Sequence, residues 1–366
     1  MLEPCRKRRS SDNQKPIPLF PYSLTPLFPY PIHFLAVIRH YCRLMSKSRL
    51  NLPFLILVAA TLVSIPLVLS FLNSLHPAFD TFSHLRIHLA VLMGLLALPL
   101  LFTKLRREGA VILLLAVFAI AVTPHVFPAS EDAHAGEAAQ PHYRLLQMNL
   151  RFDNGSPEQA LSLIAHIRPD VVTLEEVSSM WREKFGHIAS AYPYSIFCPH
   201  PGAVFGVAIL SRRPFIADSA PACDPKGMMA VASVDFGGRP VDVAALHLHW
   251  PWPFQQSEQI EALSEQFRGL SENAILSGDL NATPWSATTK RIAELAAMTP
   301  APPTGPTWLY RRLPASLRFA GLPIDQTFAK GRVAISKITR QQPIGSDHLP
   351  ILVEFSIIPQ PETVAS

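Results

Sequence analysis

Three long apolar stretches, at residues 52–72, 87–103 and 109–127, constrain the fold of this chain more than any other feature. The shortest has 17 residues and would span about 26 Å as a helix, close to the thickness of the membrane hydrocarbon layer. Within them only His88 and His125 can carry a charge. The sequence therefore predicts three transmembrane helices. A composition of 49% hydrophobic and 16% charged residues agrees with a membrane segment joined to an ordinary domain.

Basic residues flank these stretches unevenly and predict their orientation. Lys47 and Arg49 precede the first stretch, and Lys104, Arg106 and Arg107 lie between the second and the third. The third is followed by acidic residues, with no Lys or Arg before residue 144. Because basic loops stay on the cytoplasmic side, we expect a multi-pass protein of the cell (inner) membrane with a cytoplasmic N-terminus. Everything after residue 127 would then lie outside the cytoplasm, in the periplasm or the extracellular space.

The rest of the chain divides into four parts. Residues 1–44 are basic at first and then rich in proline, which predicts a disordered extension, with Met45 as an alternative start. Residues 128–141 form a short linker whose small residues, such as Ala133 and Ala135, give the third apolar stretch a likeness to a signal peptide. Two apolar stretches precede it, so we expect a retained anchor. A globular domain is predicted over residues 142–357, with a tail at 358–366.

Short apolar runs divided by turn residues are typical of strands, and they fill the predicted domain. Strands are expected at Tyr143–Asn149, 171–174, Tyr194–Cys198, 206–210, Met229–Asp235, 241–247, 274–277 and 351–355. Helices are expected at Pro157–Ile167, 255–270 and 286–297. Many strands with a few interspersed helices predict an α/β layered sandwich.

Polar side chains gather at the ends of these strands. They are Asn149, Glu175, Glu176, His247, Asp279, Asn281, Asp325, Asp347 and His348. A strand end is rigid and the loop that it opens is exposed, so side chains from several strands can meet there. Carboxylates, amides and histidines in one place suit a divalent cation and a phosphate group, which predicts a metal-dependent hydrolase of phosphoric ester bonds. Taken alone, Asp279 and Asn281 could equally be turn formers, and Asp347 and His348 could equally cap the start of a strand.

Four short motifs carry a resemblance to a known family. Gly278-Asp279-Leu280-Asn281 matches G-D-x-N, Ser346-Asp347-His348 matches S-D-H, residues 169–176 match P-D-[VI]-[VI]-x-L-Q-E, and Leu246-His247-Leu248 matches T-H-L. In this order and at these distances the motifs resemble those of the endonuclease/exonuclease/phosphatase (DNase I-like) superfamily. Glu175 stands in the usual Gln position, Leu246 in place of the Thr, and Arg151 where many relatives carry an acid. The last difference leaves the number of metal ions open.

The resemblance implies a four-layer α/β sandwich, in which two packed mixed β-sheets are flanked by helices. It also implies roles for the matching residues. Glu176 would bind Mg²⁺ or Mn²⁺, assisted by Asn149 and Asp347. His348, oriented by Asp325, would contact the scissile phosphate. Asp279 would align or deprotonate the attacking water, while Asn281 and His247 stabilise the phosphoryl oxygens.

The substrate class is less constrained than the chemistry. From residue 141 to the end the chain has 19 Lys/Arg and 20 Asp/Glu, a balance of −1, whereas nucleic-acid binding usually draws on excess basic residues. Trp250 and Trp252 lie in a proline-rich loop after His247, and Trp favours the headgroup region of membranes. Either this loop touches the membrane or a lipid tail, or it forms an internal aromatic cluster.

The overall layout is similar to that of membrane-anchored members of the superfamily with three N-terminal spans. That similarity implies a lipid-linked phosphate, such as a polyprenyl pyrophosphate or a phospholipid, as the substrate. An extracytoplasmic endonuclease or exonuclease and a non-catalytic binding module are the alternatives. Cys198 and Cys223 fall within the same predicted domain and would form a disulfide if it is exported, or remain two free thiols.

Overall fold

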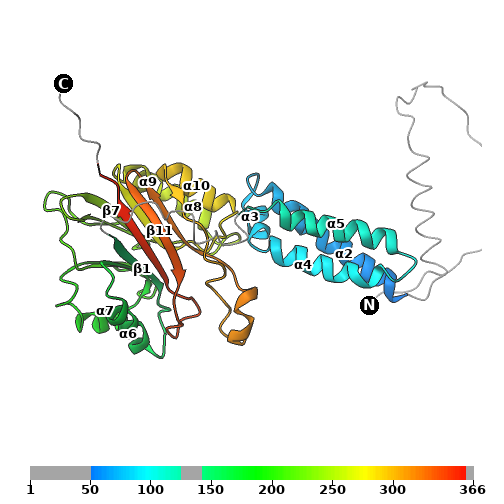
Figure 1. Cartoon of the computed structure of the whole chain (residues 1–366), viewed down its shortest axis with the longest axis horizontal. Helices are drawn as coiled ribbons and strands as arrows, with labels where there is room; N and C mark the ends of the chain where they lie inside the picture. The colour runs from blue at the N-terminus through cyan, green and yellow to red at the C-terminus, as the bar shows by residue number, and fades with distance from the viewer. Residues whose placement is uncertain (1–50, 125–141, 360–366) are drawn as a thin grey trace, which may run out of the picture. The chain divides into compact units, whose positions relative to one another are not determined.

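The computed structural model describes residues 51–124 and 142–359 (Figure 1). The predicted disordered extension lies outside the described residues, as do the end of the third apolar stretch, nearly all of the predicted linker and most of the tail. The described helices and sheets belong to the same compact unit.

The first two apolar stretches and most of the third are helical. Helix α2 (Leu52–Leu69) continues into the 3₁₀ turn η1 (Ser70–Leu72), and the short α3 (Pro77–His84) precedes α4 (Arg86–Leu100) and α5 (Arg106–Ala121). Helix α4 packs against both α2 and α5. Small residues permit this close packing: a Cβ on Gly109 of α5 would lie 2.8 Å from the Cβ of Leu100.

Of these helices in the described ranges, one is long and apolar enough to cross a membrane, namely Leu52–Leu72. A second qualifies if α3 and α4, which meet at a bend of 63°, are counted as one broken span. Helices α4 and α5 have 15 and 16 residues, so each is only about 22–24 Å long. Pro99 lies in the last turn of α4, which ends three residues before the predicted boundary. The three-span arrangement therefore stays a prediction.

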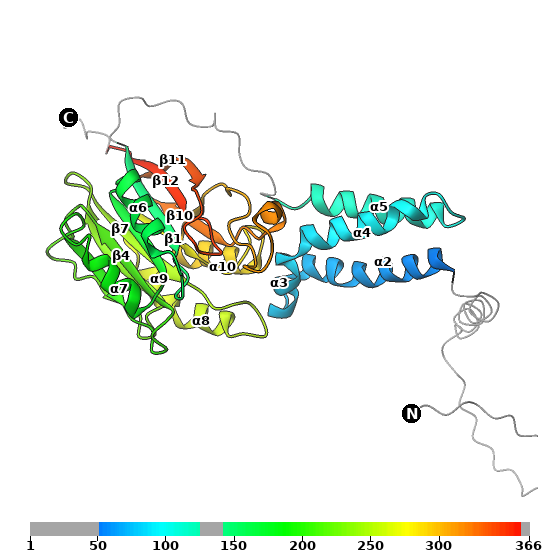
Figure 2. The same cartoon turned by 90° about the horizontal axis from the view of Figure 1, so that it is seen from below.

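Residues 142–359 form two six-stranded mixed sheets, and Figures 1 and 2 show their strands between two groups of helices. The first sheet has the order β11-β12-β1-β2-β4-β3, and the second has the order β5-β6-β7-β8-β10-β9. The strands of the first are β1 (Tyr143–Asn149), β2 (Val171–Val177), β3 (Tyr194–Cys198), β4 (Gly206–Ser211), β11 (Val333–Arg340) and β12 (Ile351–Ile357). Those of the second are β5 (Ala222–Cys223), β6 (Met229–Asp235), β7 (Pro240–His247), β8 (Ala274–Asp279), β9 (Thr299–Pro300) and β10 (Asp325–Lys330).

Alternation along the strands builds three apolar layers, because successive side chains face opposite sides of a sheet. Leu145, Val243 and Ile275 lie in the core between the sheets. On the outer face of the first sheet, the neighbouring Leu146 packs with α6 (Pro157–Ile167) and α7 (Ser179–Gly186). On the outer face of the second, Leu246 packs with residues of α8 (Gln256–Ala262), α9 (Ser264–Gly269) and α10 (Ala287–Ala296). The result is a sandwich of four layers, with the sheets inside.

The eight predicted strands are all present, and the predicted sandwich of two mixed sheets is confirmed. Four strands were not predicted: the two-residue β5 and β9, and the adjacent β10 and β11. The predicted helix at 255–270 is wrong as one element, because it breaks at Leu263 into α8 and α9. Helices α3 and α7 and the 3₁₀ turn η2 (Ala315–Ala320) were also not predicted.

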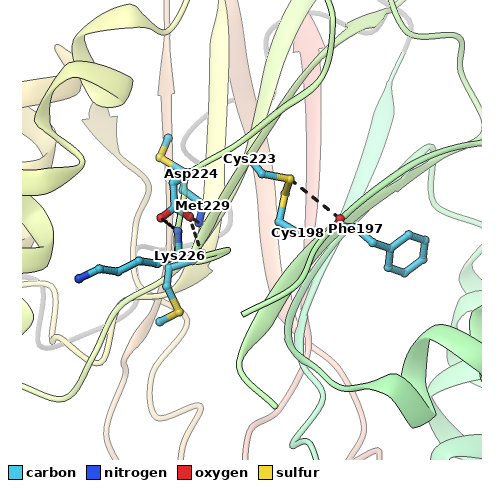
Figure 3. Close-up of a disulfide and its surroundings, with 7 residues drawn as sticks. Phe197, Cys198, Cys223, Asp224, Lys226 and Met229 are labelled. Carbon is cyan, nitrogen blue, oxygen red and sulfur yellow. Dashed lines mark hydrogen bonds between the residues drawn. A yellow bond between two sulfur atoms is a disulfide. The ribbon is translucent and has the colours of Figure 1, made fainter. Parts of the chain in front are cut away.

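A disulfide joins Cys198 of β3 to Cys223 of β5 (Figure 3). These strands are edge strands of different sheets, so the bond connects the two sheets covalently at one side of the sandwich. Cys198 is buried, whereas Cys223 is exposed. Beside the bond, the Asp224 carboxylate accepts hydrogen bonds from the backbone N–H groups of Lys226 and Met229, which holds the β5–β6 turn together.

Candidate active site

The layer between the sheets changes from apolar to polar at one end. Along β8 the inward-facing residue Ile275 is apolar, and the inward position at the end of the strand is Asp279. Along β7 the same change leads from Val243 to His247. Since β7 and β8 are parallel, both polar residues lie at the same edge of the sheet. Both side chains are buried.

Strand register brings three of the predicted residues side by side. Asp279 pairs directly with His247 across β7 and β8. Asp279 also pairs directly with Asp325 across β8 and β10. The ring Nε2 of His247 lies 3.8 Å from Asp279 Oδ2. Asp325 comes together with the others because it begins an antiparallel strand at the edge where β8 ends.

The first sheet contributes Asn149 and Glu176 to the same place. The amide Nδ2 of Asn149 donates to Asp279 Oδ2 at 2.9 Å and to Glu176 Oε1 at 3.3 Å. The other oxygen of Glu176 accepts from the backbone N–H of Phe152 at 3.1 Å. Glu176 has a φ of 57°, and the pairing of β2 with β4 is irregular between Leu174 and Val177. This bulge lets neighbouring residues Glu175 and Glu176 both bond to side chains of β1.

His348 lies between two carboxylates. Its Nδ1 lies 2.9 Å from Asp325 Oδ2, and its Nε2 lies 3.6 Å from Asp279 Oδ2. Burial opposes a charge on this ring, but Asp325 and Asp279 outweigh it and raise the pKa of His348 to about 10. The ring is therefore cationic at neutral pH and holds its proton against both carboxylates.

The other titratable groups of the site are shifted mainly by burial. Burial, with the charge of Asp325, raises the pKa of Asp279 to about 7, although His348 opposes the shift. Burial lowers the pKa of His247 to about 4, so this ring is neutral at pH 7. Burial also raises the pKa of Glu176, against the bonds from Phe152 and Asn149. A carboxyl group that titrates near neutral pH, as Asp279 does, is suited to exchange a proton with water.

Glu175 stands in the family's Gln position, and its environment explains why Glu can replace Gln there. Its side chain is buried, and burial raises its pKa well above the ordinary value. The raised pKa favours the protonated carboxyl, which resembles a Gln amide in carrying both an acceptor and a donor. Gln147 Nε2 donates to Glu175 Oε2 at 2.7 Å and to Asp325 Oδ1 at 2.9 Å, so this buried chain supports the partner of His348.

Asn281 lies next to Asp279 in a strained backbone. Its φ is 47°, in the left-handed region that only a few non-glycine residues adopt. Its backbone N–H donates to Asp279 Oδ1 at 2.8 Å, and its side-chain Nδ2 donates to the Leu248 carbonyl at 2.8 Å. Its Oδ1 is buried and has no hydrogen-bond partner in the described part of the chain. The amide is thus held in place with its orientation fixed.

Asp347 and Trp250 both contact Trp308, a residue that was not predicted as part of the site. Trp308 Nε1 donates to Asp347 Oδ2 at 3.3 Å, and the ring of Trp308 packs edge-on against Trp250 with centroids 5.3 Å apart. Trp250 is 41% exposed. Trp252 lies elsewhere, because it lines a cavity of about 420 Å³ with residues of α3, α8 and α10. The two tryptophans predicted as a pair therefore have different surroundings.

Comparison with known families decides what kind of site this is. The model of the Endonuclease/Exonuclease/phosphatase family matches residues 146–348. The chain belongs to this family. It is a phosphoester hydrolase, and the buried Asp279, Asp325 and His348 lie within the matched segment. Among curated proteins the comparison finds no match.

A solved structure shares the fold of this chain, and two others match it more weakly. An endonuclease/exonuclease/phosphatase from Bacteroides vulgatus has a TM-score of 0.50 and 17% identity, over 60% of this chain and 100% of that one. A humanized D. rerio TDP2 has a TM-score of 0.48 and 20% identity, over 59% of this chain and 99% of that one. Sphingomyelinase C from Streptomyces griseocarneus has a TM-score of 0.43 and 17% identity, over 58% and 99%.

The family typically uses a divalent metal, and the residues present fit one. Glu176 is largely withdrawn from solvent, and within the described part of the chain it pairs with no Lys or Arg. A cation would remove the cost of its buried charge. Asp279, Asp325 and His348 also offer ligand atoms within 4.8 Å of one another. Their atoms already bond to one another, however, and a protonated His348 nitrogen cannot ligate a metal. Glu176 is therefore the better candidate ligand.

Several residues around the site were not predicted from the sequence. Gln147, Trp308 and Phe205 each touch a predicted residue; the ring centroid of Phe205 lies 6.2 Å from that of His247. Gln147 was detectable in principle, because a polar residue at an inward position of an apolar strand needs a polar partner. The other two lie in loops, where no periodicity marks the side chains that face the site.

Proposed function

We propose that this phosphoesterase is divalent-metal-dependent and acts outside the cytoplasm on a lipid-linked phosphate or pyrophosphate of the cell envelope. The observation that carries the lipid assignment is the contact of Trp250 with Trp308, whose indole bonds to Asp347 beside His348. Half-exposed aromatic rings next to a phosphate site favour a substrate with an apolar part. The near-zero charge of residues 141–366 supports this assignment over a nucleic acid.

The proposed roles follow from the geometry. Asp279, whose pKa is raised to about 7, takes the proton of the attacking water. The water oxygen forms the new bond to phosphorus, the P–O bond to the leaving group breaks, and the released oxygen takes a proton from solvent. His348 is cationic, and its Nε2 stabilises charge on the phosphoryl oxygens while Asp325 fixes its orientation. His247, with its neutral ring, and Asn281 bind the same oxygens.

Glu176 is the proposed ligand of Mg²⁺ or Mn²⁺, with Asn149 and Asp347 assisting. A bound cation at this place would neutralise the charge that develops on the phosphate. Asn149 supports this assignment because its amide already joins Glu176 to Asp279. Asp347 supports it through its half-buried position next to His348 in the chain.

The proposed location rests on the surface of the helices and on the disulfide. Leu62, Leu95 and Leu114 are 61%, 59% and 68% exposed on α2, α4 and α5, an apolar surface that is stable within lipid. The basic Lys104, Arg106 and Arg107 lie at the end of α4 opposite α3, and α3 contacts the hydrolase domain. A disulfide between the sheets agrees with an oxidising compartment.

A panel assay tests the substrate class. The full chain in detergent micelles is given a polyprenyl pyrophosphate, phospholipids, a chromogenic phosphodiester and DNA, each with Mg²⁺ or Mn²⁺. We expect the highest kcat/KM with a lipid-linked phosphate. A preference for DNA would replace the proposal with an extracytoplasmic nuclease. Protease treatment of intact cells and of inverted vesicles tests the location, and cleavage of the domain only in inverted vesicles would refute it.

A further inference from the structure

Helix α3 forms hydrogen bonds with the loop that follows Asp279. This loop, residues 280–286, carries Asn281 and leads into α10. Both oxygens of the Asp80 carboxylate accept from the first turn of α10: Oδ1 from the Ala287 N–H at 2.8 Å and Oδ2 from the Thr288 N–H at 2.9 Å. Asp80 is 5% exposed. A helix begins with four N–H groups that lack partners within the helix, so α3 provides acceptors for two of them.

A second side chain of α3 holds the middle of the same loop. His84 is buried, and burial lowers its pKa to about 4, so its ring is neutral and Nδ1 can accept. The Thr283 N–H donates to His84 Nδ1 at 3.2 Å. The Trp285 indole donates to the Ser83 carbonyl at 2.7 Å. Four donors of the loop and the helix start therefore have their acceptors on α3, about 200 residues earlier in the chain.

The position of this loop affects Asp279, the proposed base. Thr283 is two residues from Asn281, whose N–H donates to Asp279 Oδ1. Asn281 also has a left-handed φ of 47°, which persists only where the surroundings fix it. If the contacts with α3 were lost, the loop would relax, and the Asn281 N–H would no longer hold the Asp279 carboxylate at a fixed angle.

We propose that Asp80 and His84 are positioning residues for the catalytic loop, so that the segment between the first two apolar helices sets the turnover rate of the hydrolase. This inference rests on the proposed role of Asp279. It assigns to α3 a function in the reaction beyond connecting α2 to α4, and it makes full activity depend on docking of the helical segment.

The test uses the full chain in detergent micelles and compares Asp80→Ala, Asp80→Asn and His84→Ala with the parent. The control is Lys290→Ala, which removes only a surface pair with Glu294 on α10. Hydrogen exchange of the amides at 283–288 reports docking, and kcat and KM for a soluble chromogenic phosphodiester report positioning. Thermal unfolding confirms that each variant is folded at the assay temperature.

We expect Asp80→Ala to speed exchange at residues 287 and 288 and to lower kcat about tenfold, with KM within about twofold, because misplaced catalytic groups mainly lose rate. Asp80→Asn keeps one acceptor oxygen and should fall between the parent and Asp80→Ala. Faster exchange with unchanged kcat in both Asp80→Ala and His84→Ala would overturn the positioning role, and unchanged exchange would overturn the docking. A parent that is protected at 287 and 288 but hydrolyses no ester would instead refute the proposed function, and this inference with it.

Discussion

His348 and Asp325 share a buried hydrogen bond of 2.9 Å between Nδ1 and Oδ2. Because Asp325 occupies Nδ1, the ring presents Nε2 toward Asp279, 3.6 Å away. The carboxylate thus fixes both the orientation of the ring and the nitrogen that remains for the phosphate. It also raises the pKa of His348, together with Asp279 and against the effect of burial, to about 10.

Replacing Asp325 should therefore change the pH dependence of the reaction. In the parent enzyme the raised pKa keeps His348 protonated until the pH approaches about 10. In Asp325→Asn the main charge that raises this pKa is gone, while burial still lowers it, so the proton leaves at a lower pH. We expect kcat/KM to fall about 10²-fold or more at neutral pH and the basic limb of its pH profile to move to lower pH. Profiles of kcat/KM against pH for both proteins check this, and parallel profiles would contradict it.

Glu176 should determine the metal requirement. Removing the proposed ligand in Glu176→Ala should raise the Mg²⁺ concentration for half-maximal activity at least about 100-fold, because even outer contacts of a metal site are worth up to that factor. Chelation by EDTA should abolish the activity of the parent, and added Mg²⁺ or Mn²⁺ should restore it. Glu183→Ala, which alters an exposed residue of α7, is the control. Equal Mg²⁺ dependence in Glu176→Ala and the parent would exclude Glu176 as a ligand.

The disulfide between the sheets should contribute stability and not catalysis. Cys198 and Cys223 are 25 residues apart, and cross-linking a loop of that length stabilises a fold by about 3.5 kcal/mol in the chain-entropy model. The double variant Cys198→Ser/Cys223→Ser should lose about that much unfolding free energy, while kcat stays near that of the parent. Urea unfolding of both proteins measures the difference. An unchanged midpoint would show that the sheets need no covalent link.

Trp250 should affect lipid substrates selectively. Its half-exposed ring packs on Trp308 beside Asp347, so Trp250→Ala should lower kcat/KM for a lipid-linked phosphate about tenfold, in line with the loss of one aromatic anchor. Hydrolysis of a soluble diester should change less than about twofold. Trp252→Ala provides the comparison, because Trp252 lines the cavity next to α3 instead. Equal losses for both substrates in Trp250→Ala would refute the lipid role of this ring.

Much of the site follows from local sequence patterns. Asn149, His247 and Asp279 end strands with a clear apolar alternation, and parallel neighbours place such ends at one edge. The short motifs around Asp279 and His348 identified these two residues as members of the site. The placement of Asn149, His247 and Asp279 needed only the period of a strand and the positions of its ends.

Other features depend on contacts that a single sequence does not encode locally. Glu175 and Glu176 both bond to β1 because of a bulge with a left-handed residue, which the alternation of a regular strand does not predict. Asp325 follows a short apolar run, yet it begins a strand whose pairing with β8 is long-range. Asp80 caps a helix that begins 207 residues later. Each of these arises from tertiary packing.

The most direct measurement of the proposed chemistry compares Asp279→Asn with Asp242→Asn. Both residues are buried aspartates of the second sheet, but Asp242 lies at the other end of β7, where it accepts from the Ser271 N–H. The full chain in detergent is assayed with Mg²⁺ on a chromogenic phosphodiester and on a polyprenyl pyrophosphate. We expect Asp279→Asn to lose about 10³-fold or more in kcat on whichever ester the parent hydrolyses, and folded Asp242→Asn to stay within about tenfold. Folded Asp279→Asn with parental activity would contradict the assignment of this site.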